Sequence, residues 1–87
     1  RAKVIRNRNA LTESLTALGF NCLPSSANFL LVSHKDLDAK TIAAQLREQN
    51  IIVRYFAIPR ISQFLRISIG SEQENQLLLA AIKTLLA

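Results

Sequence analysis

The 87-residue sequence has no tryptophan or methionine, one cysteine, and only two glycines and two prolines. Because glycine and proline, which interrupt helices and strands, are so few, we expect regular secondary structure to fill most of the chain. The lone Cys22 excludes an internal disulfide and a metal site built from several cysteines, and it is typical of a reducing, cytoplasmic setting. We expect its thiol to be a buried, structural group.

Long apolar runs are missing as well. No stretch reaches the roughly 20 residues that a membrane span needs, and the first residues form a polar, basic helix pattern instead of a signal peptide. Hydrophobic residues make up 49% of the sequence, which is enough for one core but at this length not for two. We therefore expect one soluble domain that binds no membrane.

Acidic residues are also scarce. Eleven basic residues stand against six acidic ones, a net charge of +5, which could indicate a nucleic-acid partner. Much of the excess lies in the first eight residues, where a solvated helix face explains it, and the rest of the chain is nearly balanced. Because the sequence also lacks a glycine-rich phosphate loop, a zinc pattern and an aromatic RNA-binding signature, we expect no nucleic acid to bind.

Apolar residues at helical spacing predict three helices. The first ends before Gly19, placed as a C-cap glycine, and the second begins at the N-cap Asp38 and ends at Asn50 in the left-handed conformation. Ser71 and Glu74 have the spacing of a capping box, so the third helix begins there. The expected apolar stripes are Val4, Ile5, Leu11, Leu15 and Leu18, then Ala39, Ile42, Ala43 and Leu46, and then Leu77, Leu78, Ala81, Ile82 and Leu85.

Four short extended segments lie between these helices. Residues 20–23 end at a proline, and a "PSS" turn leads into "ANFLLVS" at 27–33, of which we expect both faces to be covered. The strands "IIVR" at 51–54 and "FLRISIG" at 64–70 flank a loop in which Pro59 prevents continuous pairing. This order predicts an α+β two-layer sandwich, with helices packed on one face of a small, mostly antiparallel sheet.

An arginine interrupts the last of these strands. Side chains alternate along a strand, so Leu65, Ile67 and Ile69 share one face, whereas Phe64 and Arg66 share the other. Arg66 is therefore expected to point away from the helices. Because Phe64 is apolar, we expect a further protein surface to cover that face.

A second arginine, Arg54, ends the preceding strand and could reach the same region. Two guanidinium groups suit an oxoanion, because each planar fork donates two hydrogen bonds and stays charged. The alternative is that Arg66 is a structural residue paired with a carboxylate or with backbone carbonyls.

Other reactive side chains give weaker signals. Ser25 and Ser26 lack a nucleophile elbow, and His34, in a polar turn without a partner nucleophile, is expected to be exposed. Tyr55 is expected to pack and Arg60 to be solvated, and neither receives a role.

Three segments, in this order, carry a resemblance: "PSSANFLLV" at 24–32, "NIIVR" at 50–54 and "FLRISIGSEQENQLLLAAI" at 64–82. Together they resemble the C-terminal small domain of histidinol-phosphate aminotransferases, which belong to the fold type I family of pyridoxal-phosphate enzymes. The resemblance covers nearly the whole chain. Because "LRI" followed by a glycine and a capped helix occurs across related aminotransferases, another fold type I aminotransferase or a phosphate-ester decarboxylase remains the first alternative.

The resemblance implies roles for three residues. Arg66 would anchor the acidic group of the substrate, on a face turned toward the large domain of the enzyme. Arg54 would hold the phosphate of histidinol phosphate, and Asn28, with Phe29, would line or support the cleft. Asn50 stands where relatives commonly have glycine, and asparagine can replace glycine there because it tolerates positive φ.

The resemblance also implies a reaction and a missing part. The parent enzyme, a cytoplasmic homodimer of histidine biosynthesis, would convert histidinol phosphate and 2-oxoglutarate to imidazole-acetol phosphate and glutamate with pyridoxal phosphate. The family's Schiff-base lysine belongs to the large domain, and Lys3, Lys35, Lys40 and Lys83 do not match it. We therefore expect residues 1–87 to be a single C-terminal small domain without the large domain, inactive alone and without catalytic, cofactor-binding or metal-binding residues. A stand-alone α+β module that binds a small anion or nucleic acid is the alternative of a different class.

Overall fold

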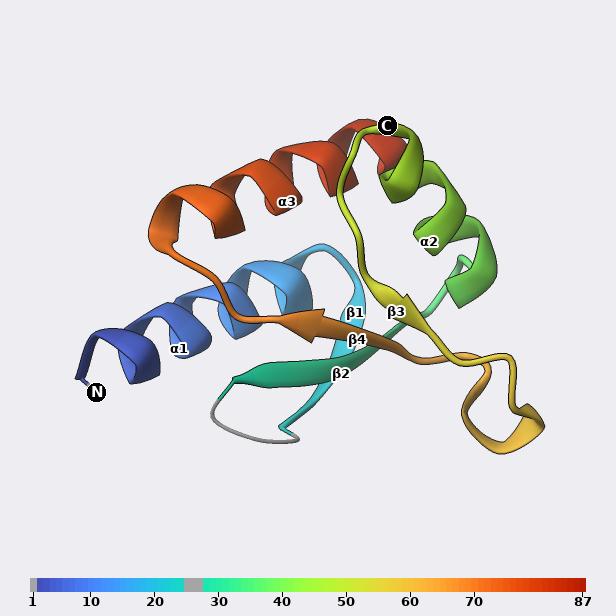
Figure 1. The fold of residues 1–87 in the computed structure, drawn as a ribbon, viewed down its shortest axis with the longest axis horizontal. Coiled ribbons are helices and arrows are strands. Elements are labelled where there is room, and N and C mark those ends of the chain that lie inside the picture. The colour runs from blue at the N-terminus through green and yellow to red at the C-terminus, as the bar shows by residue number, and fades with distance from the viewer. Residues whose placement is uncertain (1, 25–27) are drawn as a thin grey trace.

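The computed structural model describes residues 2–24 and 28–87, the side chain of Pro24 excepted. Within them, helices α1 (Ala2–Ala17), α2 (Ala39–Glu48) and α3 (Glu72–Leu86) lie on one side of a four-stranded sheet (Figure 1). The sheet runs in the order β1-β2-β4-β3, every neighbouring pair is antiparallel, and a short 3-10 helix, η1, lies in the β3–β4 loop. The bounds are β1 Phe20–Pro24, β2 Phe29–His34, β3 Arg54–Tyr55, β4 Leu65–Ser68 and η1 Pro59–Ile61. The predicted α+β two-layer sandwich is confirmed.

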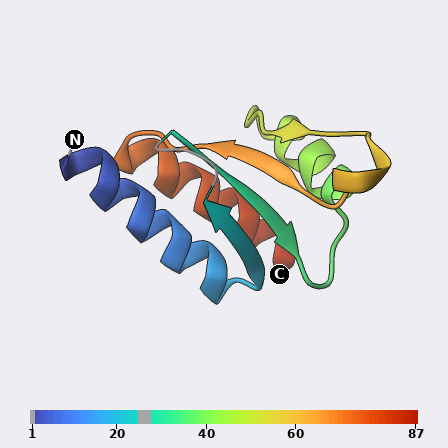
Figure 2. The ribbon, with the colours of Figure 1, turned by 90° about the horizontal axis from the view of Figure 1, so that it is seen from below.

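The core lies between the sheet and the helices. Leu30 and Val32 of β2 are paired with Ile67 and Leu65 of β4, and all four side chains are at most 2% exposed. The helices cover this face with leucine and isoleucine side chains, and α1 and α3 run side by side across it (Figure 2). The alternation predicted along "LRISI" is thus the alternation of a sheet with one packed face.

Side-chain caps begin α2 and α3 as the sequence predicted. Asp38 accepts a hydrogen bond from the backbone N–H of Thr41 at 3.4 Å. The Ser71 hydroxyl accepts from the N–H of Glu74 at 3.1 Å, and the Glu74 carboxylate accepts from the N–H of Ser71 at 2.8 Å. These bonds satisfy amide groups that a helix start leaves without intrahelical partners.

Gly19 and Asn50 follow their helices at positive φ, +99° and +65°, which confirms both predicted stops. A Cβ atom on Gly19 would lie 2.9 Å from Nε2 of His34. This histidine is half-buried, not exposed in a polar turn as expected, because it is the last residue of β2. Its Nδ1 accepts from the N–H of Asp36 at 3.0 Å, so its Nε2 is the protonated nitrogen and donates to the carbonyl of Leu18 at 2.9 Å.

Two helical stripes differ from the expected ones. On α3, Leu78, Ala81 and Ile82 are buried and Leu85 packs against the core, as expected, but Leu77 is 66% exposed. Asn75 and Leu79 are buried in addition, so the inward face is rotated away from Leu77. Three consecutive leucines left this choice open in the sequence. On α1, Val4 and Ile5 are exposed because the helix start extends beyond the sheet (Figure 1).

The strand predictions need three corrections. Of the expected strand at 51–54 only Arg54 pairs, together with Tyr55, because residue 51 is still held to the end of α2 by a bond from its N–H to the carbonyl of Leu46. Residue 28 is a bend and β2 begins at Phe29, and the side of β2 away from the helices is only partly buried. The "PSS" turn and Ser25 and Ser26 lie outside the described residues.

Candidate anion-binding site

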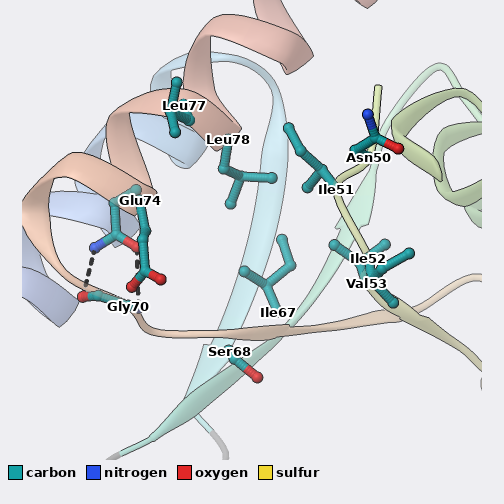
Figure 3. Close-up of a pocket in the computed structure, with 11 residues that line it drawn as sticks. Asn50, Ile51, Ile52, Val53, Ile67, Ser68, Gly70, Glu74, Leu77 and Leu78 are labelled. Carbon is teal, nitrogen blue, oxygen red and sulfur yellow. Dashed lines mark hydrogen bonds between the residues drawn. The ribbon is translucent and has the colours of Figure 1, made fainter. Parts of the chain in front are cut away.

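The face of the sheet away from the helices carries two arginines side by side. Arg66 is paired with Leu31 of β2 on one side and with Arg54 of β3 on the other. Figure 3 shows the side chains of Ile67 and Ser68 leaving opposite sides of β4, so Arg66 lies on the same side as Ser68. The prediction that Arg66 points away from the core, toward the region that Arg54 reaches, is confirmed.

Aromatic rings, and not carboxylates, accompany the two arginines. The Cζ atom of Arg66 lies 4.8 Å from the centre of the Phe29 ring, and that of Arg54 lies 5.6 Å from the centre of the Phe56 ring. In the part of the chain that the structure describes, neither guanidinium has a hydrogen-bond or ion-pair partner. A ring face orients a guanidinium without neutralising it, so two like charges remain directly opposite each other. The described residues therefore do not support the alternative of a structural ion pair.

These arginines border a hollow of about 420 Å³. Its lining comes from three parts of the fold, namely the end of α2, the edge of the sheet at β3, and β4. No acidic residue contributes to it among the described residues. The lining residues are Arg47, Ile52, Val53, Arg54, Tyr55, Arg66 and Ser68. A hollow with three cations, two hydroxyl-bearing residues and no acidic residue in its described lining is suited to an anion.

The third expected site residue, Asn28, lies apart from this lining. It is exposed immediately before β2, and its backbone carbonyl accepts a hydrogen bond from the N–H of Ile69 at 2.7 Å. It therefore ties the start of β2 to the end of β4. The guanidinium of Arg66 lies over the ring of Phe29, the residue that follows Asn28. The geometry thus gives Asn28 a supporting position beside the site.

Sequence reasoning missed Arg47. This residue lies in the last turn of α2, where its exposure matches the polar side of an amphipathic helix. Helical periodicity contains no sign that it shares a hollow with two strand residues. A cation without a carboxylate three or four positions away was the one signal available, and it is a weak one.

A second hollow, of about 310 Å³, opens between the start of α3 and residues 50–53 (Figure 3). Two of its polar side chains are engaged locally: the Asn75 amide exchanges hydrogen bonds with the N–H and carbonyl of Gly70, and Glu74 caps α3. The remaining lining is mainly apolar. We therefore regard this hollow as part of the packing around the helix start.

Other ligand chemistry finds little support in residues 2–24 and 28–87. No three histidine, cysteine or acidic side chains gather there as a metal site would require. The helices of this part of the chain are too short or too polar to cross a membrane. Cys22 is half-buried, burial raises the pKa of its thiol, and the hydroxyl of Thr16 donates to its sulfur at 3.9 Å.

An α+β domain with an unneutralised arginine pair on its open sheet face has a geometry suited to recognising an anion. Residues 1–82 match the family described as aminotransferase class I and II, and the chain belongs to this family. Over 81 residues the chain is 53% identical to a histidinol-phosphate aminotransferase of Acinetobacter baumannii, and the matched region covers 93% of this chain and 22% of that protein. The resemblance carried by the three sequence segments is thereby confirmed.

Two solved structures share the fold. The histidinol-phosphate aminotransferase of Clostridium acetobutylicum matches with a TM-score of 0.85 over 98% of this chain and 27% of that one, and its 22% identity shows the fold alone. A decarboxylase from Sulfurospirillum multivorans matches with a TM-score of 0.82 and 26% identity over 98% of this chain and 23% of that one. The chain thus spans about a quarter of these proteins or less, and the fold occurs with more than one chemistry.

Proposed function

We propose that this chain is the substrate-recognition domain of a pyridoxal-phosphate-dependent aminotransferase. Its substrates would be histidinol phosphate and 2-oxoglutarate, and its products imidazole-acetol phosphate and glutamate. The observation that carries the proposal is the pair Arg54 and Arg66, directly opposite each other and without a described counterion. Family membership and the 53% identity to a histidinol-phosphate aminotransferase support the reaction class and the substrate.

Each residue has a separate part in this proposal. Arg66 is half-buried and oriented by Phe29, so its fork is positioned to anchor the acidic group of the substrate with two hydrogen bonds. Arg54 is exposed on the edge strand, where it holds the phosphate of histidinol phosphate. Asn28 supports both by fixing the end of β4 beside the start of β2. The contribution of this chain to catalysis is therefore the positioning of the reacting group.

The cofactor is assigned to another part of the protein. No lysine lies among the described residues that line the arginine hollow, so this hollow does not supply the amine that pyridoxal phosphate needs. In the proposed enzyme, pyridoxal phosphate acts as an electron sink during amino-group transfer. A large domain of the same polypeptide holds it, and the open sheet face of this chain is turned toward that domain. We further propose that the enzyme is a cytoplasmic homodimer and that residues 1–87 alone are inactive.

An assay of the complete protein that carries this chain tests the reaction. With histidinol phosphate, 2-oxoglutarate and pyridoxal phosphate, glutamate should accumulate. Release of carbon dioxide from a phosphorylated amino acid, without glutamate, would instead identify the decarboxylase alternative, which the structural likeness to a decarboxylase keeps open. A gene that encodes no cofactor-binding lysine would favour a stand-alone anion-binding module.

A further inference from the structure

We propose that Arg47 is a third member of the anion site and makes the hollow prefer a doubly charged phosphate group over a singly charged carboxylate. The inference rests on the proposed function and adds a specificity-determining residue to it. It concerns the part of the hollow that the end of α2 lines, to which the sequence analysis assigned no residue.

The path of the chain brings Arg47 to the site. Asn50, at φ +65°, reverses the chain after α2, and its N–H donates to the carbonyl of Arg47 at 2.9 Å. Residues 51–55 then run back along the edge of the sheet, because β3 is an outer strand. Arg47, Arg54 and Arg66 therefore approach one hollow from three different elements.

The surroundings of Arg47 leave its charge available to a ligand. The positions three and four residues away on the chain are Ala43, Ala44, Asn50 and Ile51, so α2 offers it no carboxylate at the spacing that forms helical ion pairs. Glu48 follows directly and, at this spacing, does not face it. A cation in the last turn complements the helix dipole. The dipole explains a cation at the end of α2, but it does not explain the place of that cation in a hollow with two further arginines.

The preference for a dianion follows from Coulomb's law. At equal distance a dianion gains twice the interaction energy of a monoanion from each cation. An exposed ion pair raises affinity by no more than about fivefold. Loss of the Arg47 charge should therefore weaken binding of a dianion by about three- to fivefold and of a monoanion by about twofold.

The test is a titration of the isotopically labelled 87-residue chain followed by amide chemical shifts. The probes are methyl phosphate near pH 8, where it is largely a dianion, and acetate, both at constant ionic strength. The variant is Arg47→Gln. The matched control is Arg60→Gln, which removes the same charge from η1 and from outside the lining of the hollow. The double variant Arg54→Gln and Arg66→Gln reports on the proposed function itself.

The expected result is a larger loss of methyl phosphate than of acetate affinity in Arg47→Gln, beyond any loss in the Arg60 control. Equal losses for the two anions, or values equal to the control, overturn the role of Arg47. If binding nevertheless disappears in the double variant, the proposed function stands. No saturable binding by the unmodified chain, or full binding by the double variant, overturns both.

A folding control accompanies the titration. If circular dichroism shows that Arg47→Gln does not fold, Arg47→Lys takes its place. Lysine keeps the charge, so this variant should retain the preference for the dianion. Loss of the preference in a folded Arg47→Lys chain contradicts the charge argument.

Discussion

Replacing Arg54 and Arg66 by glutamine, singly and together, should show that the two side chains repel each other in the folded chain. They are paired directly across β3 and β4. The Cβ atoms of such a pair are about 4.5–5.5 Å apart, and we take the two guanidinium charges to lie about 8 Å apart, within the range of neighbouring long side chains on one sheet face. At that separation the repulsion is about 0.5 kcal/mol in water and about 1 kcal/mol at an effective dielectric constant near 40.

Single substitutions mix this repulsion with other effects. Arg66→Gln also removes the contact with Phe29, and Arg54→Gln removes the contact with Phe56. Contacts of this kind at exposed sites contribute about 0.5–1 kcal/mol each, as much as the repulsion itself. The coupling energy of the double-mutant cycle separates the pairwise term. We expect it to be repulsive by about 0.5–1 kcal/mol.

Urea unfolding of the unmodified chain, both single variants and the double variant measures this coupling. Raising the salt concentration to about 0.5 M should reduce it, because exposed charges are screened. A second cycle, between Arg66 and Lys83, is the control, since Lys83 lies on α3 across the sheet, and its coupling should be near zero. A coupling of zero between Arg54 and Arg66, or an attractive one, would refute the conclusion that the site holds two facing, unneutralised cations.

The remaining predictions concern the fold. Leu79→Ala should lower the free energy of unfolding by about 2–4 kcal/mol and Leu77→Ala by no more than about 0.5 kcal/mol, because of these two only Leu79 is buried. Equal losses for the two variants in urea unfolding would contradict the inward face assigned to α3. Gly19→Ala should lower the melting temperature, because a Cβ at φ +99° is strained and meets His34, and part of the loss should be recovered in a His34→Ala background. Hydrogen bonds from the side chain and backbone of Thr41 hold the pKa of Asp38 below its usual 3.8. Its stabilising effect is therefore present above that pH and is lost as the pH falls through the lower folded value. An Asp38→Asn chain, whose cap does not titrate, should lose less stability on acidification, and identical pH profiles would contradict this.

Much of the fold follows from local sequence signals. The capping residues Asp38 and Ser71 and the positive-φ positions Gly19 and Asn50 were predicted because each satisfies a backbone requirement within a few residues of itself. The direction of Arg66 was predicted for a similar reason, since strand parity needs no knowledge of distant parts of the chain.

Features that depend on tertiary packing were harder to predict. Of three adjacent leucines on α3, Leu78 and Leu79 are buried and Leu77 is exposed, because the position of the sheet selects which of them face inward. His34 was expected to be exposed, because nothing in its sequence neighbourhood shows that the carbonyl of Leu18 would accept from it. Arg47 was missed because it meets the arginine pair only after the chain reverses at Asn50.

The most direct test of the account compares the unmodified complete enzyme that carries this chain with its Arg66→Lys variant. The measured quantity is kcat/KM for histidinol phosphate, with Arg60→Lys as the control. Lysine keeps the positive charge but cannot donate two parallel hydrogen bonds from a planar fork. We predict a loss of about ten- to a hundredfold in the Arg66 variant, equivalent to about 1.5–3 kcal/mol for one charged hydrogen-bonding contact, and no loss in the control. An unchanged kcat/KM in the Arg66 variant would contradict the central claim that the open face of this sheet binds the substrate.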